Sequence, residues 1–111
     1  LDVDAIISTT RGNHTLASVP SGVVVLVKMN IYIEHASAFP AVYISNPNLT
    51  DIAPSKTATP LGQLRGTSSP SFLSYTEQFT DTSSQISSRS ENTATTFRVA
   101  IMGWVDPRGR W

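Results

Sequence analysis

The chain has 111 residues, and its eight Lys or Arg balance eight Asp or Glu, so the formal net charge at pH 7 is zero. This length suits one domain whose single core buries about two-thirds of the surface of the unfolded chain. Because the basic residues are spread along the sequence, nucleic-acid binding is disfavoured. The absence of Cys excludes disulfides and thiol chemistry, and no apolar run is long enough to cross a bilayer.

We therefore expect a single domain over residues 1–111, without membrane insertion. The sequence starts at Leu1 with neither a Met nor a basic signal-peptide head. This start leads us to expect a C-terminal fragment or processed piece of a longer protein.

The N-terminal part of the chain predicts two short strands and two turns. Residues 1–8 alternate weakly between apolar and polar side chains, and residues 15–19 form a second strand candidate. Polar residues at 9–14 and the Pro-Ser-Gly sequence at 20–22 are typical of turns.

A long strand is predicted over residues 21–36. Its odd positions from Val23 to Ile33 are all apolar, while the even positions from 28 onward carry Lys28, Asn30, Tyr32 and Glu34. This period of two and the many β-branched residues indicate a central strand with one buried face. The second face also carries the apolar residues Val24, Leu26 and Tyr32. They are covered either by the same chain or by further copies of it.

The remainder of the chain predicts further strands around one long loop. Residues 41–45 resume the alternation and are expected to pair antiparallel with the long strand, and the prolines between 46 and 70 predict a loop. Sixteen of the thirty residues at 67–96 are Ser or Thr, but apolar anchors argue against disorder and favour strands at 71–79 and 84–90. These anchors are Phe72, Leu73, Tyr75, Phe79 and Ile86.

A final strand is predicted over 95–105, with Phe97, Val99 and Ile101 facing inward. The sequence thus predicts about seven strands and no helix of about ten residues or more. We expect an all-β antiparallel sandwich, either jelly-roll-like or immunoglobulin-like.

Catalytic and metal chemistry have little support in the sequence. No Ser lies in a Gly-x-Ser-x-Gly elbow, and the bases for nucleophilic catalysis are limited to His14 and His35. The carboxylates do not define a glycosidase pair, and the histidines lack metal-ligand spacing. We therefore expect no enzyme, no metal and no cofactor, and we expect His35 to be a strand-end histidine with a hydrogen-bond partner.

Recognition by a surface is the remaining function. Sugar rings stack on aromatic side chains, and sugar hydroxyls need planar hydrogen-bonding groups. The aromatic candidates are Tyr43, Tyr75, Trp104 and Trp111, although a core or interface position is favoured for Trp104 because it continues a buried strand. The predicted ligand site is the loop 46–54 with its neighbours, namely Tyr43, Asn46, Asn48, Asp51, Arg65 and His14.

Three segments, 45–55, 84–90 and 103–110, resemble the C-terminal receptor-binding domains of bacteriophage tail fibres and related virion spikes. The strongest of them is the sequence Gly-Trp-Val-Asp-Pro-Arg-Gly at 103–109. With the intervening strands, these segments cover about the last two-thirds of the chain. The resemblance implies a β-sandwich head at the tip of a fibre in the virion.

Such a head would attach the virion to a polysaccharide or other glycan, or to a protein receptor, on the host surface. The resemblance also implies a homotrimer. Its subunit contacts are expected at Val24, Leu26, Tyr32, Trp104, Asp106, Arg108 and Arg110. A free-standing lectin or carbohydrate-binding module is the alternative function.

Overall fold

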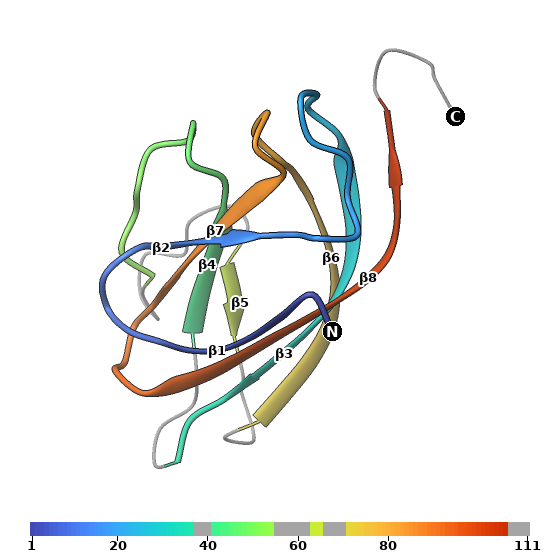
Figure 1. Cartoon of the computed structure of the whole chain (residues 1–111). Coiled ribbons are helices and arrows are strands. Elements are labelled where there is room, and N and C mark those ends of the chain that lie inside the picture. Colours follow the sequence, from blue (N-terminus) through green and yellow to red (C-terminus); the bar gives the residue numbers. More distant parts are fainter. Residues whose placement is uncertain (37–40, 55–62, 66–70, 107–111) are drawn as a thin grey trace.

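The computed structural model describes residues 1–36, 41–54, 63–65 and 71–106, which form strands and connections (Figure 1). Within these ranges there are eight strands and no helix. The strands are β1 (Val3–Ile7), β2 (Gly12–Thr15), β3 (Leu26–Glu34), β4 (Ala41–Ser45), β5 (Gln63–Arg65), β6 (Ser71–Phe79), β7 (Gln85–Ser90) and β8 (Thr95–Val105).

The strands form two antiparallel sheets of four. The first sheet has the order β1-β8-β3-β6 and the second has the order β2-β7-β4-β5. Only β4 and β5 are neighbours both in the chain and in a sheet, so the other connections pass from one sheet to the other. The expected all-β sandwich is confirmed, and two four-stranded sheets joined in this way correspond to its jelly-roll form.

The core lies between the two sheets and follows from the alternation of β3. Its odd residues Val27 to Ile33 are buried while its even residues are half-buried or exposed, which confirms the predicted buried face. As predicted, β3 is also central, because it pairs with β8 on one side and β6 on the other. The cluster around it contains Val27, Met29, Ile31, Ile33, Val42, Ile44, Ile86, Phe97 and Val99.

The start of the long strand differs from the prediction. Residues 21–25 precede β3, and Gly22 has a φ of 81°, a conformation that glycine adopts without a steric penalty. The backbone N–H of Gly22 donates to the carbonyl of Thr82, so this segment joins the 80–84 turn instead of extending the sheet. Alternation of side chains identifies a buried face but does not show where strand pairing begins.

The predicted turn at 9–14 is confirmed only over residues 9–11, and the predicted strand at 15–19 is wrong. Gly12–Thr15 is strand β2, because its backbone pairs with β7 from Ser88 to Gln85. Residues 16–19 instead make a turn closed by a hydrogen bond from the Val19 N–H to the Leu16 carbonyl. The side chains of Leu16 and Val19 in this turn are buried. These residues, which suggested a strand over 15–19, are therefore apolar because this turn packs into the core.

The expected pairing of residues 41–45 with the long strand is contradicted. Strand β4 belongs to the second sheet, where it pairs with β5 and β7. The chain therefore passes between the sheets after β3. Strands joined by short connections usually pair with each other. In a jelly roll, most strands instead pair with strands from distant parts of the sequence.

Strand β8 contains a bulge that the sequence pattern does not reveal. Met29 pairs with Ile101 and Lys28 with Gly103, which leaves Met102 as an extra residue. The inward positions of Phe97 and Val99 are confirmed, and Ile101 packs against the core. Beyond the bulge Trp104 is the partner of Val27, yet its side chain is exposed at this end of the sandwich.

Candidate functional site

The outer face of the second sheet is covered by the loop that follows β4. All five residues of β4 are buried, including Tyr43 and Ser45, which point away from the core. Asn46 begins the loop as an Asx turn: its Oδ1 accepts from the Asn48 N–H at 2.9 Å, and its carbonyl accepts from the Leu49 N–H. Its own amide donates to the Phe79 carbonyl at 2.8 Å, so Asn46 also ties the loop to the first sheet.

An ion pair between Asp51 and Arg89 anchors the middle of this loop to strand β7. Arg89 Nη1 lies 3.0 Å from Asp51 Oδ2, and Arg89 Nε donates to the Thr9 carbonyl at 2.9 Å. The Tyr43 hydroxyl donates to the carbonyl of Thr50 at 3.3 Å. These contacts join the 46–54 loop, strand β7 and the segment before β2 into one surface.

A second guanidinium lies beside this loop. Arg11 donates to the Ser45 hydroxyl at 3.2 Å and to the Asn46 carbonyl. Its Nε is buried without a hydrogen-bond partner, and no carboxylate pairs with Arg11 in the part of the chain that the structure describes. The site therefore contains two guanidinium groups and a single paired carboxylate, which favours ligands with acceptor or anionic groups.

We call this the polar loop surface. It consists of half-buried or exposed planar polar side chains from three separate segments, namely Arg11, Asn13, Asn48, Asp51 and Arg89. Sequence reasoning missed Arg11, Asn13 and Arg89. The alternation of 84–90 places Arg89 and Ser87 on one face, but the register that brings Tyr43 opposite Arg89 is a property of the folded sheet.

The predicted ligand residues do not all meet at this surface. Tyr43 is only 6% exposed and Asn46 is buried, so both support the loop, and the Tyr43 ring is unavailable for stacking. Asn48 and Asp51 are exposed in the loop. Arg65 ends β5, next to Ala41, and its side chain lies outside the described residues.

His14 lies on the opposite face of the second sheet. It pairs with Ile86 of the core, and its ring centroid lies 5.1 Å from that of Phe97 in the first sheet. Burial lowers the pKa of its imidazole from the ordinary value of 6.5. His14 therefore belongs to the interior and does not join the loop residues.

His14 also makes the contact that comes nearest to a catalytic arrangement. Its Nε2 lies 2.6 Å from Ser88 Oγ, the distance expected of a nucleophile and its base. Ser88 is only 1% exposed, however, so a substrate cannot reach its hydroxyl. We interpret the pair as an internal hydrogen bond that satisfies a buried serine.

The predicted contact residues fall in different environments. Leu26 and Tyr32 lie half-buried on the outer face of the first sheet, and Val24 is exposed just before β3. Trp104 is exposed and Asp106 is buried. Arg108 and Arg110 lie outside the described residues.

Three further observations bear on function. His35 Nε2 lies 2.9 Å from the Thr93 carbonyl, which confirms the expected strand-end partner. Within the described ranges, no His, Asp and Glu side chains gather in a group able to hold a metal ion. The same ranges contain no helix with the length and apolarity to cross a membrane.

Searches of protein-family models, curated proteins and solved structures found no match to this chain. Its function is therefore inferred from its own residues.

Proposed function

We propose that the chain is a non-catalytic attachment domain of a phage tail fibre or related virion spike, acting outside the cell on a host-surface glycan. The supporting observation is the anchored loop 46–54. The Asp51–Arg89 ion pair and the Asn46 turn hold this loop in place, while amide and guanidinium groups stay at the surface. A preformed set of planar donors and acceptors suits sugar hydroxyls because little ordering is needed on binding.

Recognition on this surface would rest on hydrogen bonds. Its described part has no exposed aromatic ring, because Tyr43 is buried beneath the loop. Exposed hydrogen bonds contribute modestly, so a single site is expected to be weak. Repeated sites in a homotrimer, the assembly that the resemblance implies, would then supply avidity.

Arrays of bacterial polysaccharides and other glycans provide the direct test, with binding measured for wild type, Arg11→Gln and Asp51→Asn. Losing hydrogen bonds that involve charged groups should weaken binding by about tenfold or more. Asp4→Asn is the matched control, because Asp4 also forms an ion pair, at 3.1 Å from Arg98, but on the first sheet. Failure of every glycan to bind, or equal loss in the control, would contradict the assigned surface.

A free-standing lectin or carbohydrate-binding module would use the same surface without needing a trimer. Sedimentation of the glycan-binding protein separates the two functions. A species that stays monomeric at high concentration while it binds glycan would favour the lectin.

A further inference from the structure

Strand β6 presents three large apolar side chains away from the core, while the side chain of Phe72 lies outside the described residues. Leu73, Tyr75 and Phe79 are 68%, 48% and 43% exposed, respectively. The alternate residues Ser74, Thr76 and Gln78 pair with buried residues of β3 and therefore lie on its core-facing side. This reverses the usual orientation, and it contradicts the expectation that these three apolar residues anchor the Ser/Thr-rich stretch. Among those predicted anchors, Ile86 is buried in the core.

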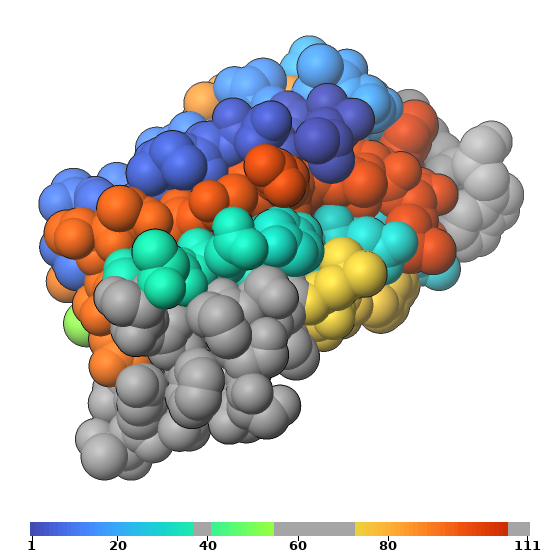
Figure 2. Space-filling model, turned by 90° about the horizontal axis from the view of Figure 1, so that it is seen from below, coloured from blue at the N-terminus to red at the C-terminus, as the bar shows by residue number. Residues whose placement is uncertain are grey.

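The apolar surface continues onto β3. Phe79 pairs with Leu26 and Leu73 with Tyr32, so the four side chains lie on one face of the first sheet. The Arg98 guanidinium lies 5.6 Å from the centre of the Tyr32 ring, at the margin of this area. We call the area the β6–β3 patch, formed by Leu26, Tyr32, Leu73, Tyr75 and Phe79 (strands β3 and β6 in Figure 2).

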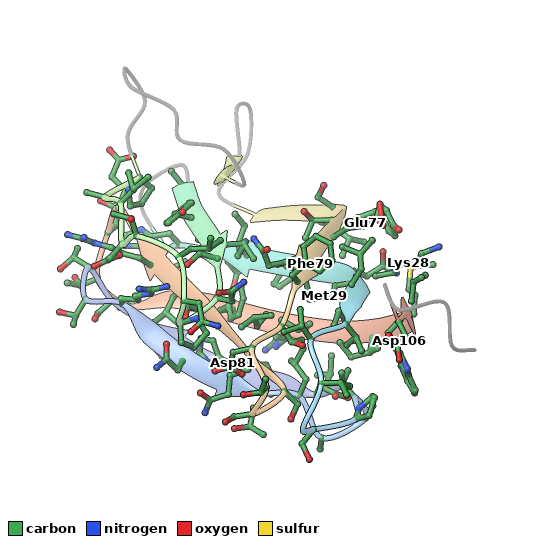
Figure 3. The ribbon with its side chains drawn as sticks, turned by 90° about the horizontal axis from the view of Figure 1, so that it is seen from above. Lys28, Met29, Glu77, Phe79, Asp81 and Asp106 are labelled. Carbon is green, nitrogen blue, oxygen red and sulfur yellow. The ribbon has the colours of Figure 1, made fainter. Side chains whose placement is uncertain are left out.

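Charges of both signs interrupt the patch. Lys28 and Glu77 are cross-strand partners between its apolar rows, and Figure 3 shows them near Phe79 at one end of the molecule. The described part of the chain contains no ion pair between them. A surface carrying both charges can meet a rotated copy of itself with Lys28 near Glu77, and zero net charge removes general repulsion between copies.

We propose that the β6–β3 patch is where a second copy of this chain docks. Three large apolar side chains on one strand stay exposed in the monomer, and grouped apolar side chains of this kind mark interaction sites. A flat sheet face bearing balanced charges fits its own copy. A patch that meets its own copy in this way forms a two-fold pair. The proposal is argued from these residues and does not rest on the trimer or on glycan binding.

The size of the patch predicts how strong this association is. Strands β3 and β6, about 4.8 Å apart and each nine residues long at about 3.3 Å per residue, cover roughly 300 Å² in projection. A standard interface buries about 800 Å² on each partner. The isolated domain should therefore associate with a dissociation constant of about micromolar or weaker, so its oligomeric state should depend on concentration.

Sedimentation velocity over a concentration series tests the proposal with Leu73→Asp and Ile6→Asp. Ile6 is the matched control, because it is 69% exposed on the same outer face but lies on β1, the opposite edge strand. Leu73→Asp should weaken association by at least about tenfold, because docking would bury the unpaired carboxylate that this substitution introduces. Ile6→Asp should leave association unchanged. Circular dichroism and urea unfolding check that both variants fold.

Two results would overturn the proposal: a wild-type domain that is monomeric at millimolar concentration, or equal weakening by both variants. Weaker glycan binding by Leu73→Asp than by wild type, compared at concentrations where both are monomeric, would instead assign the patch to sugar. If no glycan binds but association still depends on Leu73, the proposed function is contradicted while the docking proposal remains supported.

Discussion

His14 and Ser88 hydrogen-bond to each other inside the sandwich, with 2.6 Å between Nε2 and Oγ. The imidazole is partly buried against Phe97, and burial lowers its pKa. Protonation of His14 therefore works against folding.

The free energy of unfolding should depend on pH through His14. As pH falls through the unfolded value of 6.5, the unfolded chain binds a proton that the folded chain does not, so stability falls. The slope is at most about 1.4 kcal/mol per pH unit, and it disappears below the lowered folded pKa. Urea unfolding between about pH 8 and about pH 5 measures it. His14→Gln should flatten this slope, whereas His35→Gln should retain it because His14 is still present.

Asn46→Ala should destabilise the domain by about 1–3 kcal/mol, because the Phe79 carbonyl and the Asn48 N–H lose their hydrogen bonds to the buried Asn46 side chain. Urea unfolding provides the free energy. Asn48→Ala is the control, since its side chain is exposed and its loss should cost less than about 0.5 kcal/mol. Equal effects would show that the Asn46 hydrogen bonds add no net stability.

The two faces of β3 should respond differently to substitution. Ile31→Ala removes a fully buried side chain and should cost about 2–5 kcal/mol, measured by urea unfolding. Leu26→Asp changes a half-buried residue on the outer face, so the strands should survive, as judged by circular dichroism, while association weakens. Wholesale unfolding of Leu26→Asp would place this residue in the core of a single chain.

Ala94→Gly should stabilise the domain. Ala94 has a φ of 57° in the turn between β7 and β8, where a Cβ costs roughly 1–2 kcal/mol and glycine does not incur that cost. Greater freedom of the unfolded glycine offsets part of this gain, so we expect about 0.5–1 kcal/mol by thermal or urea unfolding. Ala100→Gly in β8 is the control and should destabilise. A loss of stability in Ala94→Gly would mean that the turn is not strained.

The sequence predicted the strands whose side chains alternate strongly. Strand β3 and the inward residues Phe97 and Val99 follow directly from this alternation. Strand β2 could not be found in the same way, because its sequence Gly-Asn-His-Thr has no apolar alternation and its partner β7 lies seventy or more residues away. Local patterns carry no information about such a partner.

Orientation was harder to predict than strand existence. The segment 71–79 was correctly predicted as β6, but preference for apolar burial places Leu73 and Tyr75 inside, and the register with β3 places them outside. The candidate site shows the same limitation. Asn48 and Asp51 were predicted from the loop, whereas Arg11 and Arg89 join them only through the pairing of distant strands.

The Asx turn at Asn46 also defines where this protein can be re-engineered. A new loop grafted after Asn46 would inherit its anchor to Phe79, while a junction inside β4 would disturb five buried residues. A library that varies 47–54 and keeps Asp51 would therefore sample new surfaces on an unchanged sandwich. The junction after Asn46 separates the part of the second sheet that must be conserved from the part that can be randomised.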